Sequence, residues 1–351
     1  MGIKNLNNVI KTFTNINLEY ISLDKFKNMT FAVDANLFIY RFLYGNGNHI
    51  NGLFFMINKL SKFSIKPIFI FDGYAPKEKT HTLKSRKNIK QKYKKQIIQL
   101  QTDLESEWDI TNKKIILKKI ASFEKKLVYI NDNIIQSSQT LFDYMGVGYL
   151  NAEGEAEHLC AKLSKLKIVD GVISDDTDTL ACGADIILRQ FTNRNDKVLH
   201  YKMDEILYGL DINLDSFVDL CILLGTDYNS KIRGYTYSEI YNLITKYKNI
   251  EMIINELSTE IYVDYNNIRD IFLLKNINVD LRAIEYQLSK TPLLTSLINF
   301  LKDNSTIEKF TYLYRIKKMF GDTEDDVDSM KINISNKYKI FDSSYKIKFK
   351  T

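Results

Sequence analysis

The chain has 351 residues, of which 45% are hydrophobic and 26% charged, with only 3 Pro and 14 Gly. This composition excludes collagen-like, disordered and disulfide-stapled proteins, and the length suits one large unit or two closely packed ones. The formal charge of +6 suits a polyanionic partner without requiring one. The three cysteines form no CxxC pair, and no apolar stretch is long enough to cross a membrane, so we expect an intracellular protein with reduced thiols, in the nucleus or the cytoplasm.

The first half of the chain alternates strand and helix patterns, which predicts an α/β fold. Three short apolar runs of β-forming residues each end in aspartate: Thr30–Asp34, Pro67–Asp72 and Gly171–Asp175. Helical spacing of apolar residues follows or precedes them, at Asn36–Tyr44, Gly52–Phe63, Ile134–Met145 and Glu155–Leu166. Such continuous apolar runs are typical of parallel strands buried on both faces. Because ligands lie beyond the carboxyl ends of parallel strands, we expect Asp34, Asp72 and the Asp175/Asp176 pair to converge.

Three other stretches differ from this pattern. A polar helical insertion covers residues 77–129, and nine of the nineteen residues from Lys77 to Lys95 are basic while only Glu78 is acidic. Beyond Asp204 the chain reads as mostly helical, with helices predicted at Asp215–Leu224 and Tyr237–Lys248. Five carboxylates in seven residues, from Asp322 to Asp328, precede a basic tail and are interpreted as a solvated loop.

Further acidic residues occur in three short motifs. These are AEGEAEH with Glu153, Glu155 and Glu157, SDDTDTL with Asp175, Asp176 and Asp178, and LLGTDY with Asp227. Carboxylates gathered at one sheet edge repel one another and raise one another's pKa unless divalent cations neutralise them. Oxygen ligands without a Cys or His cluster indicate Mg²⁺ or Mn²⁺ rather than Zn²⁺. Enough acids are present for two ions, an arrangement typical of in-line phosphoryl displacement.

Each acidic residue also has a structural interpretation. Asp34 and Asp72 suit turns after strands, and Asp175 and Asp176 suit helix caps. Residues at i and i+2 diverge on a regular helix, so spacing does not select Glu155 together with Glu157. His158 suits a helix surface, and a position next to the metal ligands is the alternative because it directly follows Glu157. The joint pattern of three strands ending in acid, followed by two further acidic motifs, favours the metal site.

Six blocks of the chain, in order and in spacing, resemble the flap endonuclease family of XPG-type structure-specific nucleases: MGIKNL, FAVDANLFIYRFL, IFIFDGYAPKEK, GYLNAEGEAEHLCAKL, VISDDTDTLACGA and FVDLCILLGTDY. The resemblance covers residues 1–95 and 140–250 and indicates a divergent member, viral or otherwise. It implies a PIN-like twisted, mainly parallel sheet flanked by helices, with a basic helical arch and a C-terminal helix-two-turn-helix region. It also implies a metal-dependent DNA endonuclease and 5′ exonuclease that cleaves flaps or branched junctions in replication, repair or recombination.

The same resemblance assigns roles to individual residues. It implies two Mg²⁺ ions, with Mn²⁺ as a substitute, held by seven carboxylates: Asp34, Asp72, Glu155, Glu157, Asp176, Asp178 and Asp227. Lys79 and Arg86 match the pair that binds the scissile phosphate at the foot of the arch; they are two helical turns apart and share a face with Lys90. The other implied DNA contacts are Gly2, Tyr40, Lys84, Lys90, Lys231, Arg233 and Gly234. A core position is the alternative for Tyr40.

The chain departs from the family pattern after Gly234. A second glycine and a proline are expected there, but Tyr235, Thr236 and Tyr237 follow, which puts the usual backbone contact to phosphate and the potassium ion in question. No Gln-initiated sliding-clamp peptide is found near the carboxyl terminus. We expect a monomer that acts on branched or flapped DNA and does not bind membranes.

These observations predict five segments. They are an N-terminal nuclease block (1–95), a helical arch (96–139), an internal nuclease block (140–234), a helical duplex-binding region overlapping it (205–320) and a charged tail (321–351). One alternative is a Holliday-junction or gap nuclease of the same superfamily. Another is a non-catalytic DNA-binding scaffold derived from such a nuclease, in which we would expect lost carboxylates. All seven are present here.

Overall fold

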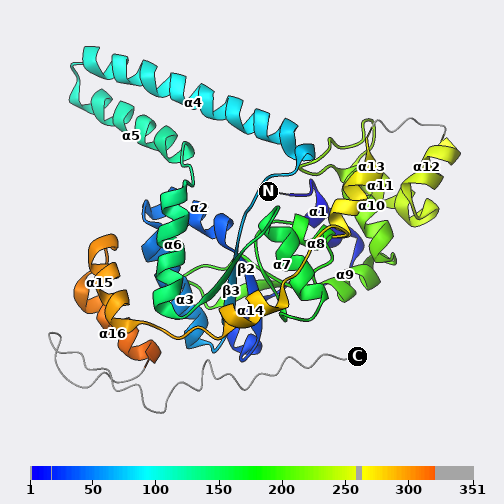
Figure 1. Cartoon of the computed structure of the whole chain (residues 1–351). Coiled ribbons are helices and arrows are strands. Elements are labelled where there is room, and N and C mark those ends of the chain that lie inside the picture. Colours follow the sequence, from blue (N-terminus) through cyan, green and yellow to red (C-terminus); the bar gives the residue numbers. More distant parts are fainter. Residues whose placement is uncertain (1, 17, 258–262, 321–351) are drawn as a thin grey trace.

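The computed structural model describes residues 2–16, 18–257 and 263–320 (Figure 1). The acidic stretch Asp322–Asp328 and the predicted tail 321–351 lie outside these residues. Within the described part, no helix combines the length and the apolar character needed to cross a membrane. The thiols of Cys160, Cys182 and Cys221 are free and buried.

A mixed, mostly parallel sheet of seven strands forms the centre of the molecule, as the α/β prediction requires. The strand order is β1-β7-β6-β5-β2-β3-β4, and β1 and β7 pair antiparallel to their neighbours. The strands are β1 (Tyr20–Ser22), β2 (Thr30–Asp34), β3 (Lys66–Phe71), β4 (Gly148–Asn151), β5 (Gly171–Ile173), β6 (Ile186–Arg189) and β7 (Lys197–Lys202). All three predicted strands are present, and β5 ends two residues before Asp175.

Helices cover both faces of the sheet, which explains why the central strands are continuously apolar. In β2, Ala32 belongs to one core while Phe31 and Val33 belong to the other. Helices α1 (Leu6–Phe13), α7 (Ala156–Lys165), α8 (Asp178–Ala181), α9 (Met203–Leu210), α10 (Leu214–Leu224) and α11 (Tyr237–Tyr247) contribute to the first core, and α2 (Ala35–Asn46), α3 (His49–Lys62) and α6 (Asp132–Met145) to the second. The four helices predicted in this half match α2, α3, α6 and α7 within a few residues.

A long helical hairpin extends away from this body (Figure 1). After a short 3₁₀ turn (Lys77–Lys79), α4 (Thr80–Ser106) and α5 (Ile110–Lys126) pack along each other, with Tyr93 and Phe123 stacked at 5.4 Å between ring centroids. The hairpin corresponds to the predicted insertion 77–129. The predicted boundary at residue 95 falls inside α4, because the helix continues without a break from Thr80 to Ser106.

The region 205–320 is helical as predicted, but it divides between the two faces. Helices α12 (Ile250–Leu257), α13 (Tyr265–Phe272) and α14 (Leu281–Leu288) stay with the first core. Helices α15 (Leu294–Asn304) and α16 (Lys309–Phe320) cross to the second core, where they pack on α6 and α3. Buried apolar residues such as Leu297 and Ile316 explain this crossing. Among the described residues of this region, the loop between α10 and α11 brings Asp227 and Tyr228 to the acidic residues at the start of α7.

Candidate active site

Asp34 and Asp72 stand at the carboxyl ends of the neighbouring strands β2 and β3. The Oδ1 atom of Asp34 accepts a hydrogen bond from Leu37 N at 3.0 Å and so caps α2. The Oδ1 atom of Asp72 accepts one from Ala156 N at 2.8 Å, the first amide of α7. The sequence suggested turns at these positions, whereas each side chain accepts a hydrogen bond from the amino end of a helix. The second oxygen of Asp34 accepts a longer hydrogen bond from Ser174 Oγ, at 3.4 Å.

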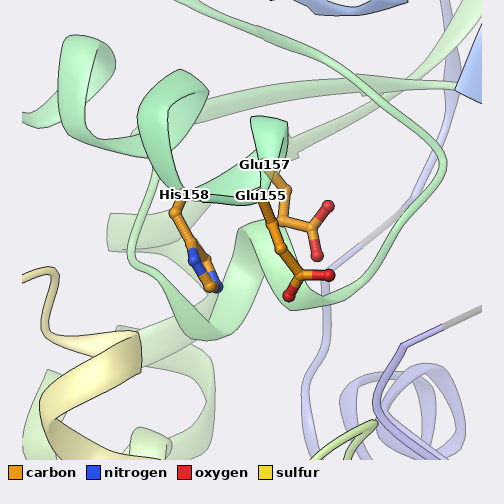
Figure 2. Close-up of side chains that lie close together, drawn as sticks. All are labelled: Glu155, Glu157 and His158. Atoms are coloured by element: carbon orange, nitrogen blue, oxygen red, sulfur yellow. The ribbon is translucent and has the colours of Figure 1, made fainter. Parts of the chain in front are cut away.

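Glu155 and Glu157 lie on the same side of α7 although they are two residues apart. Glu155 is the N-cap residue, with an extended backbone (φ −80°, ψ 140°), and Glu157 belongs to the first helical turn. The divergence expected for i and i+2 on a regular helix therefore does not apply. Figure 2 shows both carboxylates turned the same way, and oxygens of the two lie within 4.8 Å of each other and of a ring nitrogen of His158.

Two further segments complete the cluster. One contains Asp176 and Asp178, at the start of α8, and the other contains Asp227, after α10. Asp176 Oδ1 accepts a hydrogen bond from Asp178 N at 3.1 Å. Asp178 is fully buried at the start of α8, and neither of its oxygens has a hydrogen-bond partner. Asp227 lies three residues after the end of α10. All seven predicted carboxylates therefore line one region of the protein.

The amino terminus also reaches this region. A Cβ atom on Gly2 would lie 2.2 Å from Asp176 Oδ1 and 2.3 Å from Thr177 Oγ1, and the backbone of Gly2 has a φ of 91°. Both the close approach and the positive φ require glycine here. Gly2 thus lies beside Asp176 and Asp178.

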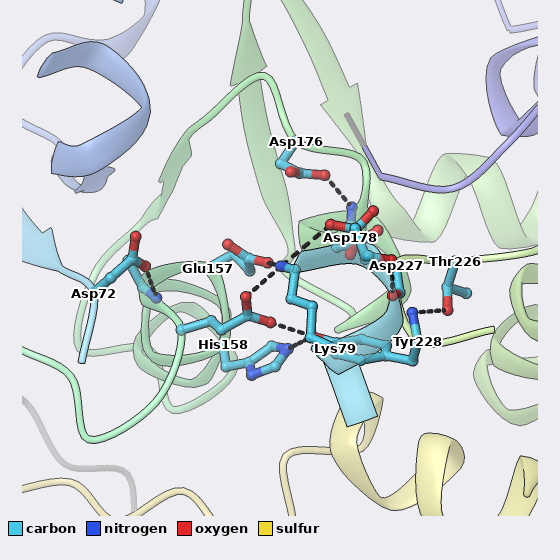
Figure 3. Close-up of polar contacts among 12 residues, drawn as sticks. Asp72, Lys79, Glu157, His158, Asp176, Asp178, Thr226, Asp227 and Tyr228 are labelled. Carbon is cyan, nitrogen blue, oxygen red and sulfur yellow. Dashed lines mark hydrogen bonds and ion pairs between the residues drawn. The ribbon is translucent and has the colours of Figure 1, made fainter. Parts of the chain in front are cut away.

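Lys79 occupies the space between the carboxylates (Figure 3). Its Nζ donates to Glu155 Oε1 and lies 3.2 Å from Asp227 Oδ2 and 3.9 Å from Glu157 Oε1. Arg86, two turns further along the hairpin, donates from Nη2 to Asp227 Oδ2 at 2.7 Å. Lys79 is buried whereas the Arg86 side chain is 42% exposed.

The ionisation of the cluster reflects burial and crowding. Desolvation, and next the charge of Asp72, raise the pKa of Asp34 to about 8. Burial, followed by neighbouring carboxylates, raises the pKa of Glu157 and Asp178 well above the usual range. Burial alone would lower the pKa of Lys79, but Glu157 and Glu155 outweigh it and raise that pKa. Two basic side chains thus balance only part of the negative charge.

Acids outside the cluster have their own partners or face solvent. Asp175 pairs with Arg41 and accepts a hydrogen bond from Gln190 N at 2.5 Å, so it belongs to a separate network. Glu153 is exposed. The selection that the family pattern made among neighbouring acids therefore agrees with their placement.

The predicted DNA contacts lie at the rim of the site or outside it. Tyr40 is 39% exposed, which excludes the core alternative. It lines a cavity of about 850 Å³ together with six of the seven carboxylates, all except Asp178, and with Arg86 and Lys90. Lys84 is exposed on α4, while Lys90 donates to Val128 O at 2.9 Å. Lys231, Arg233 and Gly234 lie in the loop between α10 and α11. A second cavity, of about 980 Å³ between α1, α9 and α10, shares no lining residue with this site.

Sequence reasoning missed Tyr228 and favoured a helix-surface position for His158. His158 is buried, with 3% exposure, rather than on a helix surface, because α7 packs its first turn against the α10–α11 loop. Tyr228 of that loop contacts both His158 and Glu155. The available signal was adjacency: each residue directly follows a predicted ligand.

Comparison with known proteins agrees with this geometry. The XPG N-terminal domain model matches residues 1–93, and the XPG I-region model matches residues 146–227. Flap endonuclease 1 of Enterocytozoon bieneusi is 33% identical over 292 residues, which cover 78% of this chain and 77% of that protein. The chain belongs to the XPG-type flap endonuclease family. The members of this family are structure-specific DNA nucleases that hydrolyse phosphodiester bonds.

Solved structures show the same fold. Flap endonuclease-1 from Methanococcus jannaschii superimposes with a TM-score of 0.63 at 26% identity, covering 87% of this chain and 96% of that one. The catalytic core of Rad2 in complex with a DNA substrate superimposes with a TM-score of 0.67 at 21% identity, covering 92% and 100%. The hairpin and the C-terminal helices are thus parts of a flap endonuclease architecture.

The raised pKa of Asp34 predicts a pH-dependent stability in the absence of divalent metal. Its pKa is 3.8 in the unfolded chain and about 8 in the folded one, so its contribution to stability is fully present below pH 4 and is lost as the pH rises through 8. In EDTA, the thermal midpoint should fall from pH 6 to pH 9, with an upper limit of about 1.4 kcal/mol per pH unit from this group. Asp34→Asn should flatten the decline, since asparagine preserves the α2 cap.

The measurement is thermal unfolding of both proteins across this pH range in EDTA, and again with Mg²⁺. Asp204→Asn, which removes an exposed carboxylate on α9, is the matched control and should follow the wild-type curve. A thermal midpoint that rises with pH, or an unchanged slope in Asp34→Asn, would contradict this account of the cluster.

Proposed function

We propose that this chain cleaves flapped or branched DNA with the help of two Mg²⁺ ions held by the seven carboxylates. The observation that carries the proposal is the meeting of these carboxylates with Lys79 and Arg86 at the foot of a basic helical hairpin. Because one chain supplies every residue of this site, we propose that the protein acts as a monomer. Mn²⁺ should substitute for Mg²⁺, since both ions prefer oxygen ligands.

The residues present fit divalent cations. Both oxygens of Asp178 and Oε1 of Glu157 are buried without hydrogen-bond partners, a costly state for carboxylates in a folded protein. Every other predicted ligand is also a carboxylate, which suits hard cations. When bound, two such ions activate water for attack on phosphorus and stabilise the leaving oxygen.

Lys79 and Arg86 are proposed to bind the scissile phosphate. Both now pair with carboxylates of the site, so neutralising Glu155 and Asp227 frees them to turn toward a phosphate. They lie on the same face of the hairpin base, and the exposed Lys84 and Lys87 follow on α4. Neutralising DNA phosphates with such basic side chains supplies much of the affinity for nucleic acid. Tyr40 at the cavity rim has the exposed ring that base stacking needs.

The start of α11 supports a weakened duplex clamp. Thr236 caps this helix in place of the expected glycine and proline: its N donates to Glu239 Oε2 at 2.7 Å, and Glu239 N donates to Thr236 Oγ1 at 3.2 Å. These two amides are therefore satisfied within the protein, and the Glu239 carboxylate disfavours a phosphate beside them. We propose that Lys231, Arg233 and Gly234 contact the duplex with ionic interactions from the two basic side chains.

The first prediction concerns the carboxylates. Asp176→Ala and Asp178→Ala should each lower cleavage in Mg²⁺ by more than about 100-fold, since even residues that only support metal ligands cost about 10- to 100-fold when removed. DNA affinity should be retained or slightly increased, because each change removes a negative charge near the phosphates. Cleavage of a 5′-flap substrate and DNA binding in EDTA provide the two measurements. Glu153→Gln, in the same acidic motif but exposed, is the control, and full activity of Asp176→Ala would refute the two-metal proposal.

The second prediction separates chemistry from binding. Lys79→Ala and Arg86→Ala should slow single-turnover cleavage by about 100- to 1,000-fold while changing the DNA Kd little, because few cations reach the scissile phosphate. Lys84→Ala, an exposed neighbour on α4, should instead change only the salt-dependent Kd. A normal single-turnover rate with a raised, salt-dependent Kd in Lys79→Ala would show that Lys79 is an ordinary phosphate contact.

The third prediction concerns the loop after α10. Cleavage should respond little when K⁺ replaces Na⁺ at equal ionic strength, and it should depend only weakly on the length of duplex distant from the cut. The purely ionic contacts of Lys231 and Arg233 are screened by salt, so activity on every duplex length should fall steeply as ionic strength rises. Flaps with progressively shortened duplex arms, cleaved in both buffers, provide the test. Strong stimulation by K⁺ with a sharp length threshold would show that the clamp functions despite Thr236.

A further inference from the structure

Two side chains beside the carboxylates, Tyr228 and His158, have no role in the function proposed above. The Tyr228 hydroxyl donates to Glu155 Oε2 and lies 3.1 Å from His158 Nε2 (Figure 3). His158 is 3% exposed, and the Tyr228 ring packs edge-on against Phe272 at 5.6 Å between centroids. Tyr228 N also donates to Thr226 Oγ1 at 3.0 Å, which holds the backbone of this residue. Packing therefore holds both rings in place, and the Tyr228 hydroxyl contacts Glu155 from this fixed position.

The direction of these hydrogen bonds follows from the number of protons. Glu155 accepts at both oxygens, from Lys79 at Oε1 and from Tyr228 at Oε2. A tyrosine hydroxyl has a single proton, and in this arrangement that proton is directed to Glu155. The contact between Tyr228 Oη and His158 Nε2 can therefore form only if the imidazole carries its proton on Nε2 and donates it.

This proton position determines whether His158 Nε2 could bind a metal. Its ring nitrogen lies within 4.8 Å of oxygens of Glu155 and Glu157, close enough for the three to be considered as ligands of one ion (Figure 2). A nitrogen that carries a proton has no lone pair for a metal. The hydrogen bond to Tyr228 thus assigns Nε2 to a donor role, and His158 acts on the site through Tyr228 and Glu155.

Glu155 needs such support because its own helix does not orient it. An N-cap side chain usually accepts a hydrogen bond from the first helical turn, but Glu155 makes no such bond to α7. Its two oxygens are directed by Lys79 and Tyr228 alone among the contacts described for the side chain. In the proposed function, Lys79 leaves Glu155 and binds the scissile phosphate. Tyr228 then remains as the contact that holds the carboxylate.

We propose that His158 and Tyr228 are positioning residues, a hydrogen-bonded pair that holds Glu155 in the orientation needed to bind a divalent cation after Lys79 leaves. This inference rests on the proposed metal centre and deepens it. It assigns the two residues to metal affinity rather than to DNA affinity, and it excludes His158 Nε2 from the ligand set. Groups that orient a metal ligand through a hydrogen bond typically change metal affinity or activity by about 10- to 100-fold.

The test compares metal binding by the full chain and its variants Tyr228→Phe, His158→Leu and the double variant. Binding of Mn²⁺ and of Mg²⁺ is measured by calorimetry without DNA, and DNA affinity is measured separately in EDTA. Tyr228→Phe keeps the ring that packs on Phe272 and removes only the hydroxyl. Each single variant should weaken both metals about tenfold, with the ratio of the Mn²⁺ and Mg²⁺ affinities unchanged. The double variant should be no weaker than the singles, since both act through one oxygen of Glu155.

Three comparisons make the result decisive. His158→Gln, which retains an N–H donor, should recover most of the metal affinity, and Tyr208→Phe, an exposed tyrosine on α9, should match the wild type. Wild-type affinity in Tyr228→Phe would overturn the proposal. If His158→Leu lost more affinity for Mn²⁺ than for Mg²⁺, the imidazole would itself be a ligand, and the proposal would be overturned for that reason. If instead Glu155→Gln binds both metals like the wild type, the metal centre itself is wrong and the proposal falls with it.

Discussion

Electrostatic repulsion among buried carboxylates is the constraint that shapes this protein around its active site. Asp178 is fully buried with no hydrogen-bond partner, and Asp34 and Glu157 have raised pKa values because burial and their neighbours oppose ionisation. A fold selected only for stability would replace such a cluster with apolar residues or pair each acid fully. Its retention is explained by ligands that the carboxylates bind together, and the rest of the fold can be understood as the framework that tolerates them.

Part of this tolerance comes from the amino ends of helices. Asp34 accepts from the first turn of α2, and Asp72 accepts from the first amide of α7. Helix N-termini carry partial positive charge and unpaired N–H groups, so they stabilise carboxylates that would otherwise only repel one another. The observed role of these residues at helix amino ends and the proposed role as metal ligands are therefore compatible.

The remaining compensation comes from the basic hairpin, which connects metal binding with DNA binding. Lys79 and Arg86 neutralise some of the cluster, and they are the residues best placed to meet a phosphate. Further along α4 the exposed lysines face solvent. In the proposed function, the carboxylates repel DNA phosphates at short range and the basic hairpin attracts them. A substrate that brings its phosphate to the site therefore needs both the cations and the released basic side chains.

The α/β class, the three central strands and the seven acids followed from the sequence, because their signals are local. An apolar run such as Thr30–Asp34 that ends in acid describes a buried parallel strand and its ligand-bearing end without any knowledge of its neighbours. The family motifs then selected Glu155 and Glu157, which periodicity had left open. The insertion was also evident, since its basic composition differs from that of the remaining chain.

Other features depended on contacts between segments distant in sequence. Nothing local indicates that Glu155 precedes its helix rather than joining it, or that Tyr228 from the α10–α11 loop meets His158 from α7 and donates to Glu155. The placement of Lys79 among carboxylates from two separate segments, and the return of α15 and α16 to the opposite face, likewise arise only when the sheet and its two cores assemble. Sequence patterns specify which side chains are available, whereas burial and hydrogen-bond geometry, which depend on tertiary packing, decide what each of them does.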